Sequence, residues 1–121
     1  MNFKIVINRF FSNKYVPLGL TLIIFILCSF PSTHLPMVSK LNDKTEHFIA
    51  FGVWAFCWQG AFGNYIRTIL LGCIYGILIE FWQAALPESF HRNFDWYDAL
   101  ADAIGVVIGV FLWRIKSFFT L

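Results

Sequence analysis

Charged residues are scarce in this chain. Lys, Arg, Asp and Glu make up 13% of its 121 residues, whereas soluble domains usually carry about 25%. Hydrophobic residues make up 59%, so too few charges remain to solvate the surface of a small globule. The composition therefore predicts an integral membrane protein with one domain, residues 1–121, and no separate soluble module.

Several functional motifs are also absent from the sequence. The three cysteines stand singly inside apolar runs, where we expect them to act as small hydrophobes rather than in disulfides. The sequence has no Gly-rich phosphate loop and no Ser-His-Asp arrangement. It also has no basic stripe interleaved with aromatic residues. We therefore expect neither a cofactor nor a nucleic-acid partner.

The apolar runs predict four transmembrane helices, at about 15–31, 45–62, 66–86 and 97–114. Several runs are shorter than the roughly 20 residues of a full span. Flanking aromatics, snorkelling lysines and local bilayer thinning can make up the difference. No small-x-small cleavage site follows Ser29, so we expect the first run to be a retained helix rather than a signal peptide. The predicted fold class is all-α: a polytopic four-helix bundle with short loops.

Lys and Arg set the expected orientation. With the N-terminus inside, six basic residues lie in the inner segments and three in the outer loops, which places both termini in the cytoplasm. The inner ones are Lys4, Arg9, Lys14, Arg67, Arg114 and Lys116, and the outer ones are Lys40, Lys44 and Arg92. All seven acidic residues lie in or beside the outer loops: Asp43, Glu46, Glu80, Glu88, Asp95, Asp98 and Asp102.

Glycine spacing predicts which helix faces pack together. One G-x-x-x-G pair begins at Gly72 on the third predicted helix and another at Gly105 on the fourth. Small residues four apart let helix backbones approach closely in lipid. Asp98 and Asp102 share a face with the second pair. We therefore expect these carboxylates to point into the bundle.

Three polar motifs meet at the outer end of the predicted bundle. A carboxylate held in hydrocarbon costs up to about 3 kcal/mol, so it needs a partner or a watered cavity. We expect Glu80 to pair with Arg92. The second expected pairing joins Asp98 or Asp102 to His47 or Lys44. The candidate ligand-binding residues are Asp43, Lys44, His47, Glu80, Gln83, Arg92, Asp95, Asp98 and Asp102.

Several candidates also have a purely structural interpretation. Asp43, with Glu46 three residues later, fits a helix N-cap, and Asp95 fits a weaker one. The role of Gln83 could be limited to a hydrogen bond with a neighbouring helix. His47 with carboxylates would suit zinc or manganese in ligand type. However, the sequence has no His-x-x-x-His or other tight ligand spacing, so we predict no metal site.

These motifs resemble those of the VanZ family of small bacterial membrane proteins. The resemblance covers residues 15 to 113 and lies in four motifs whose order and spacing agree. One residue departs from the family pattern, because the family usually has Asn where this chain has Asp102. The motifs are Asp43-Lys44 with His47-Phe48, Gly76 through Glu80-Phe81-Trp82-Gln83, Arg92-Asn93-Phe94-Asp95-Trp96-Tyr97-Asp98, and Ala101-Asp102-Ala103-Ile104-Gly105.

The resemblance implies a multi-pass protein of the bacterial cytoplasmic (inner) membrane whose outer pocket handles a cell-wall or lipid-linked ligand. The founding member contributes to teicoplanin resistance, so an antibiotic-resistance role is implied in the same way. Three functions remain open: a binding or modulating protein, an intramembrane enzyme acting on a lipid-linked phosphate or glycan, and a structural subunit of a membrane complex. In the enzyme, Glu80 or Asp98 would be the general base, His47 the general acid and Arg92 an anion clamp. The oligomeric state is not predicted.

Overall fold

The computed structural model describes residues 2–31 and 40–119, without the side chains of residues 40–42. Regular structure in these residues is entirely helical, which confirms the all-α class. The helices are α1 (Phe3–Ser12), α2 (Tyr15–Ser29), α3 (Lys40–Phe62), α4 (Tyr65–Ala85) and α5 (Trp96–Phe119), with a short 3-10 helix, η2 (Glu88–Phe90).

The helix bounds differ from the predicted ones in three places. The sequence analysis did not predict α1, which begins where the Asn2 side chain accepts a hydrogen bond of 3.0 Å from the Lys4 N–H. A break at 13–14 separates α1 from α2, and the two helices meet at a bend of 59°. In addition, α3 begins at Lys40 rather than at 45, and α5 continues to Phe119 rather than ending at 114.

Helix length and apolarity support fewer membrane spans than the four predicted. In the described part of the chain, α4 alone is long and apolar enough to cross a bilayer by itself, and α1 with α2 would add one bent span. With 23 and 24 residues, α3 and α5 are long enough. Their ionisable side chains make them less apolar, since the acidic groups of the polar motifs lie in their first turns. The observed helices therefore establish an all-helical fold, whereas their length and apolarity do not establish four spans.

Close backbone packing joins α3 to α5, the helix pair with the most extensive contact. A Cβ atom added to Gly105 would collide with the carbonyl oxygen of Phe48, and one added to Gly109 would collide with that of Gly52. Side chains larger than glycine would hold these two backbones apart. The glycine spacing therefore predicted correctly that this face of α5 packs closely, but it did not predict that α3 is the partner.

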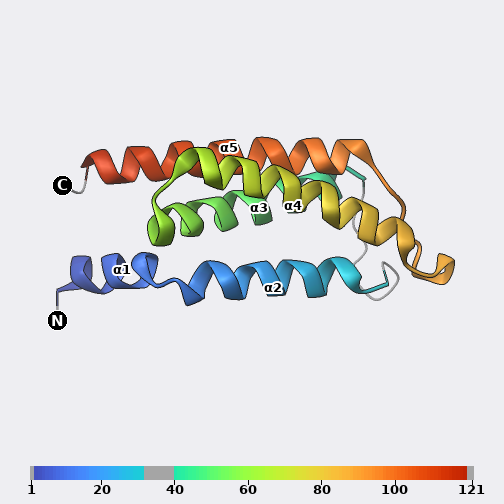
Figure 1. Cartoon of the computed structure of the whole chain (residues 1–121), viewed down its shortest axis with the longest axis horizontal. Coiled ribbons are helices and arrows are strands. Elements are labelled where there is room, and N and C mark those ends of the chain that lie inside the picture. The colour runs from blue at the N-terminus through green and yellow to red at the C-terminus, as the bar shows by residue number, and fades with distance from the viewer. Residues whose placement is uncertain (1, 32–39, 120–121) are drawn as a thin grey trace.

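Helix α2 packs on α3 and α4 through aromatic and hydroxyl groups. The Trp54 indole N–H donates a hydrogen bond of 2.7 Å to the Thr21 hydroxyl, and the Tyr75 hydroxyl donates to the Thr21 carbonyl oxygen. Phe51 and Trp54 are almost fully buried beside these contacts. Figure 1 shows α1 and the last turns of α5 at the same end of the molecule (left), away from the turn that joins α4 to α5.

The burial pattern is inverted relative to a soluble protein. Large apolar side chains are exposed along all five helices, among them Phe25, Ile49, Leu78, Phe81 and Phe111. The buried polar or charged side chains are His47, Gln59, Thr68, Glu80, Gln83, Asp98 and Asp102. The molecule therefore presents an apolar outer surface and keeps ionisable groups inside.

Candidate functional site

Lys44, in the first turns of α3, is the cation at the centre of an acidic cluster at one end of the bundle. Its ammonium nitrogen lies 2.6 Å from Asp95 Oδ2 and also hydrogen-bonds Asp98 Oδ1. Asp43 Oδ2 lies 3.8 Å away. Burial lowers the pKa of Lys44, but the hydrogen bonds that its ammonium group donates to the two aspartates outweigh this and hold the pKa above its usual value. Pairing of Lys44 with Asp98 was one of the predicted ion pairs.

Asp95 has a capping role as well as an ionic one. Its Oδ1 atom accepts a hydrogen bond of 2.9 Å from the Tyr97 N–H, in the first turn of α5. This confirms the predicted N-cap. The corresponding prediction for Asp43 was wrong, because α3 begins at Lys40 and Asp43 therefore lies within its first turn.

His47 and Asp102 form a buried pair between α3 and α5. His47 Nδ1 lies 2.8 Å from Asp102 Oδ1, and the two residues are 8% and 0% exposed. The other ring nitrogen, Nε2, lies 3.7 Å from Asp98 Oδ2 and 3.9 Å from Asp43 Oδ1. The Asp102 carboxylate is therefore held by a histidine of another helix, which is one of the pairings that the sequence left open.

Glu80, on α4, completes the buried part of the cluster. It is 0% exposed, and its Oε1 atom accepts a hydrogen bond of 3.1 Å from the Asp95 backbone N–H. The described residues provide no hydrogen-bond partner for Glu80 Oε2 or for Asp102 Oδ2, although both atoms are buried. Gly76 makes room for this arrangement, because a Cβ added there would lie 3.0 Å from both Asp102 Cβ and Asp102 Oδ2.

Arg92 does not pair with Glu80, so that prediction was wrong. Its Nε and Nη2 atoms donate hydrogen bonds of 3.0 and 3.4 Å to the carbonyl oxygens of Phe30 and Leu27. The last carbonyls of a helix have no partner within the helix. Arg92 therefore supplies hydrogen bonds to carbonyl oxygens at the C-terminal end of α2.

Gln83 supports the same end of α2. Its Nε2 atom donates a hydrogen bond of 3.2 Å to the Cys28 carbonyl oxygen. A hydrogen bond to a neighbouring helix was the predicted structural role of Gln83, and the structure confirms it. Cys28, Cys57 and Cys73 are free thiols.

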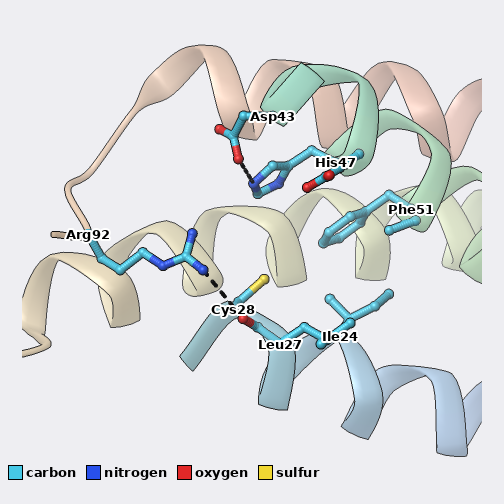
Figure 2. Close-up of a pocket in the computed structure, with 9 residues that line it drawn as sticks. Ile24, Leu27, Cys28, Asp43, His47, Phe51 and Arg92 are labelled. Atoms are coloured by element: carbon cyan, nitrogen blue, oxygen red, sulfur yellow. Dashed lines mark hydrogen bonds and ion pairs between the residues drawn. The ribbon is translucent and has the colours of Figure 1, made fainter. Parts of the chain in front are cut away.

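A pocket of about 120 Å³ opens between α2 and α3 beside this cluster. Figure 2 shows side chains of both helices facing each other across it, with Arg92 at one side. The polar lining residues are Asp43, Glu46, His47 and Arg92, and the others are Ile24, Leu27, Cys28, Ala50 and Phe51. Of the nine candidate ligand-binding residues, three line this pocket: Asp43, His47 and Arg92. The other six do not: Lys44, Glu80, Gln83, Asp95, Asp98 and Asp102.

The apolar half of this pocket was not predicted from the sequence. Helical spacing would have grouped these apolar residues on two faces. Ile24, Leu27 and Cys28 share one face of α2, and Ala50 and Phe51 share a face of α3 with His47. Which face of α2 lies opposite α3 depends on packing between distant segments, and no local pattern specifies it. The spacing alone therefore could not pair the two faces.

The geometry around His47 suits proton transfer or cation binding. A carboxylate bonded to one ring nitrogen orients an imidazole and leaves its other nitrogen for chemistry. Here Asp102 holds Nδ1, and His47 also lines the pocket. Ligand atoms of His47, Glu80 and Asp102 lie within 4.8 Å of one another, as do those of Asp43, His47 and Asp98.

Comparison with known proteins identifies one relationship. The sequence model of the VanZ/LLP1 family matches residues 8–117. No curated protein and no solved structure matches the chain.

Proposed function

Because the chain belongs to the VanZ/LLP1 family, we propose that it is a multi-pass protein of the bacterial cytoplasmic membrane whose outward-facing pocket binds a cell-wall or lipid-linked ligand. The apolar outer surface supports a bilayer environment, since a soluble protein rarely exposes contiguous apolar area of this extent. The six basic residues of the inner segments support cytoplasmic termini. In this arrangement the acidic cluster and the pocket face the cell exterior.

The pocket between α2 and α3 is the observation that carries the ligand proposal. One part of its lining is apolar, with Ile24, Leu27 and Phe51, and another part is ionisable, with Asp43 and Arg92. Such a lining fits an amphipathic molecule whose chain contacts the apolar part and whose head group contacts the charges. Lipid-linked precursors of the cell wall have this chemistry.

The size of the pocket limits how much of the ligand it encloses. Its 120 Å³ is somewhat smaller than an engineered cavity of about 150 Å³ that binds one benzene molecule. The pocket therefore holds a terminal group or a short stretch of chain, and the rest of the ligand lies outside it. Arg92 is placed to contact a phosphate or carboxylate of such a ligand, because its side chain borders the opening (Figure 2).

Orientation is tested by labelling single cysteines in a background with alanine at the three native cysteine positions. Glu88 and Ser117 are exposed near opposite ends of the bundle. In intact cells, a membrane-impermeant maleimide should label Glu88→Cys at once and Ser117→Cys only after permeabilisation. Labelling of both positions from the same side, or in the reverse order, would overturn the proposed topology.

Ligand binding is tested by filling the pocket without removing a charge. Ala50→Phe places a ring in the pocket, whereas Ala84→Leu enlarges an exposed side chain on α4 and serves as control. Lipid and cell-wall analysis of a deletion strain should show an altered intermediate, and teicoplanin sensitivity is measured in the same strains. The Ala84→Leu variant should restore the normal profile and Ala50→Phe should not, at equal protein levels in the membrane. Equal rescue by both variants would contradict the proposal.

The Asp102–His47 pair favours acid/base catalysis as a second candidate function. His47 would transfer a proton to or from a lipid-linked phosphate or glycan, with Asp102 orienting the ring. His47→Gln should then leave membrane accumulation unchanged and build up the same unprocessed intermediate as the deletion strain. A normal profile for this variant excludes catalysis by His47. Loss of the protein from the membrane instead indicates that the cluster serves to hold the helices together.

A further inference from the structure

We propose that His47, Glu80 and Asp102 form a binding site for one divalent transition-metal ion, contrary to the expectation from sequence spacing. The three residues come from α3, α4 and α5 and are 8%, 0% and 0% exposed. Their ligand atoms lie within 4.8 Å of one another. The inference goes beyond the proposed ligand pocket and does not depend on which ligand that pocket takes.

Two buried oxygen atoms provide the independent evidence for a bound cation. Glu80 Oε2 and Asp102 Oδ2 are buried, and no described residue offers either of them a hydrogen bond. Buried polar atoms are almost always satisfied, so each of these two oxygens needs a partner other than the described residues. A metal ion between the two carboxylates would satisfy both oxygens.

The charge balance of the cluster supports a cation at the same place. Lys44 bonds Asp95 and Asp98, and the Arg92 side chain donates to carbonyls of α2. Within the described residues, no Lys or Arg forms an ion pair with Glu80 or Asp102. Two carboxylates therefore share a fully buried space with one imidazole, and a divalent ion would neutralise them.

A second group of ligand atoms, from Asp43, His47 and Asp98, is a weaker candidate. Lys44 already bonds Asp98 and lies 3.8 Å from Asp43. A metal ion there would lie close to this ammonium group, and the Asp43 side chain is 36% exposed. Among the described residues no Lys or Arg pairs with Glu80 or Asp102, so the structure favours the group with Glu80.

The donor set and its access determine the class of metal. One imidazole nitrogen with carboxylate oxygens suits zinc or manganese, whereas calcium and magnesium prefer oxygen ligands alone. Two ligand atoms of a tetrahedral zinc ion lie about 3.4 Å apart, at bond lengths of about 2.1 Å. Ligand atoms within 4.8 Å of one another therefore have to approach by about 1.4 Å at most. His47 lines the pocket and provides the entry path that an exchangeable ion requires.

Zinc content of the purified full-length protein, without an affinity tag, tests the proposal. The protein in detergent is treated with EDTA, equilibrated with Zn²⁺ alone, desalted and analysed by mass spectrometry for metal. We expect about one zinc ion per chain. Glu80→Gln and Asp102→Asn should each weaken zinc binding at least about tenfold, because each replaces an anionic carboxylate ligand with a neutral amide. Asp43→Asn is the matched control and should bind zinc like the wild type.

Two further measurements on the wild-type protein remain informative if a variant fails to fold. Zn²⁺ should raise the unfolding temperature of EDTA-treated protein, since it binds only the folded state. Co²⁺ in place of zinc should give visible absorption bands of a nitrogen- and oxygen-ligated ion. Absence of zinc uptake and of both effects near neutral pH would overturn the proposal. A loss caused by Asp43→Asn but not by Glu80→Gln would also overturn it, in favour of the other group.

Discussion

A single methyl group at Gly105 should separate α3 from α5. The Cβ of Gly105→Ala would collide with the Phe48 carbonyl oxygen, and it would lie 3.1 Å from the Phe48 carbonyl carbon and 3.2 Å from the Gly52 nitrogen. All three contacts are with backbone atoms, which cannot rotate away as a side chain can. The methyl group therefore fits only if one helix moves.

The expected loss of stability follows from two opposing contributions. Overpacking a well-packed site costs about 1–3 kcal/mol, and the rigid backbone contacts place Gly105→Ala at the upper end. Alanine gains about 1 kcal/mol over glycine in a helix interior. We expect the free energy of unfolding to fall by about 2 kcal/mol, the difference between these contributions. Gly19→Ala on α2 is the matched control, because a Cβ there has no neighbour within 4 Å.

Thermal unfolding of the detergent-purified variants measures this effect. Gly105→Ala should lower the unfolding temperature by several degrees, whereas Gly19→Ala should leave it unchanged or raise it. Since Phe48 follows His47 in the chain, the shift of α3 should also weaken the His47–Asp102 contact and with it zinc binding. Equal unfolding temperatures for the two variants would refute the close approach of the α3 and α5 backbones.

Two other contacts between helices give further predictions. Lys44→Met leaves the buried Asp98 carboxylate without its cation. The free energy of unfolding should fall by about 1–3 kcal/mol, less than for a fully buried ion pair, because the Lys44 side chain is 27% exposed and water screens the interaction. Unfolding of this variant is compared with that of Lys4→Met on α1, and similar losses would contradict the role of the ion pair. Trp54→Phe removes the donor to the Thr21 hydroxyl and should cost about 1 kcal/mol. Thr21→Val removes the same hydrogen bond, so the double variant should be no less stable than the less stable single variant. If the losses of unfolding free energy add up in the double variant, the two substitutions do not remove the same interaction.

Local sequence patterns predicted much of the interior correctly. The glycine pairs indicated a close helix interface, and the spacing of Asp98 and Asp102 put both carboxylates on its inner face, where they are 6% and 0% exposed. Pairing of Lys44 and His47 with these aspartates also followed, because few other cations lie at that end. The helical period alone fixes which residues share a face.

Partners that are backbone atoms could not be predicted from sequence. Arg92 and Gln83 donate to carbonyl oxygens of α2, and Glu80 accepts from a backbone N–H. Every residue carries such groups, so no residue type marks the ones that will be reached. Electrostatic reasoning between side chains consequently gave Glu80 the wrong partner.

Composition and helical periodicity determined on their own that this chain is helical, rich in apolar surface and acidic at one end. Tertiary structure alone decided that His47, Glu80 and Asp102 meet, since they lie on three helices and no fixed spacing links them. It also decided that α2 closes a pocket against α3. The physical reason is that a helix repeats its faces locally, whereas the choice of the face it packs against depends on contacts between residues far apart in the chain.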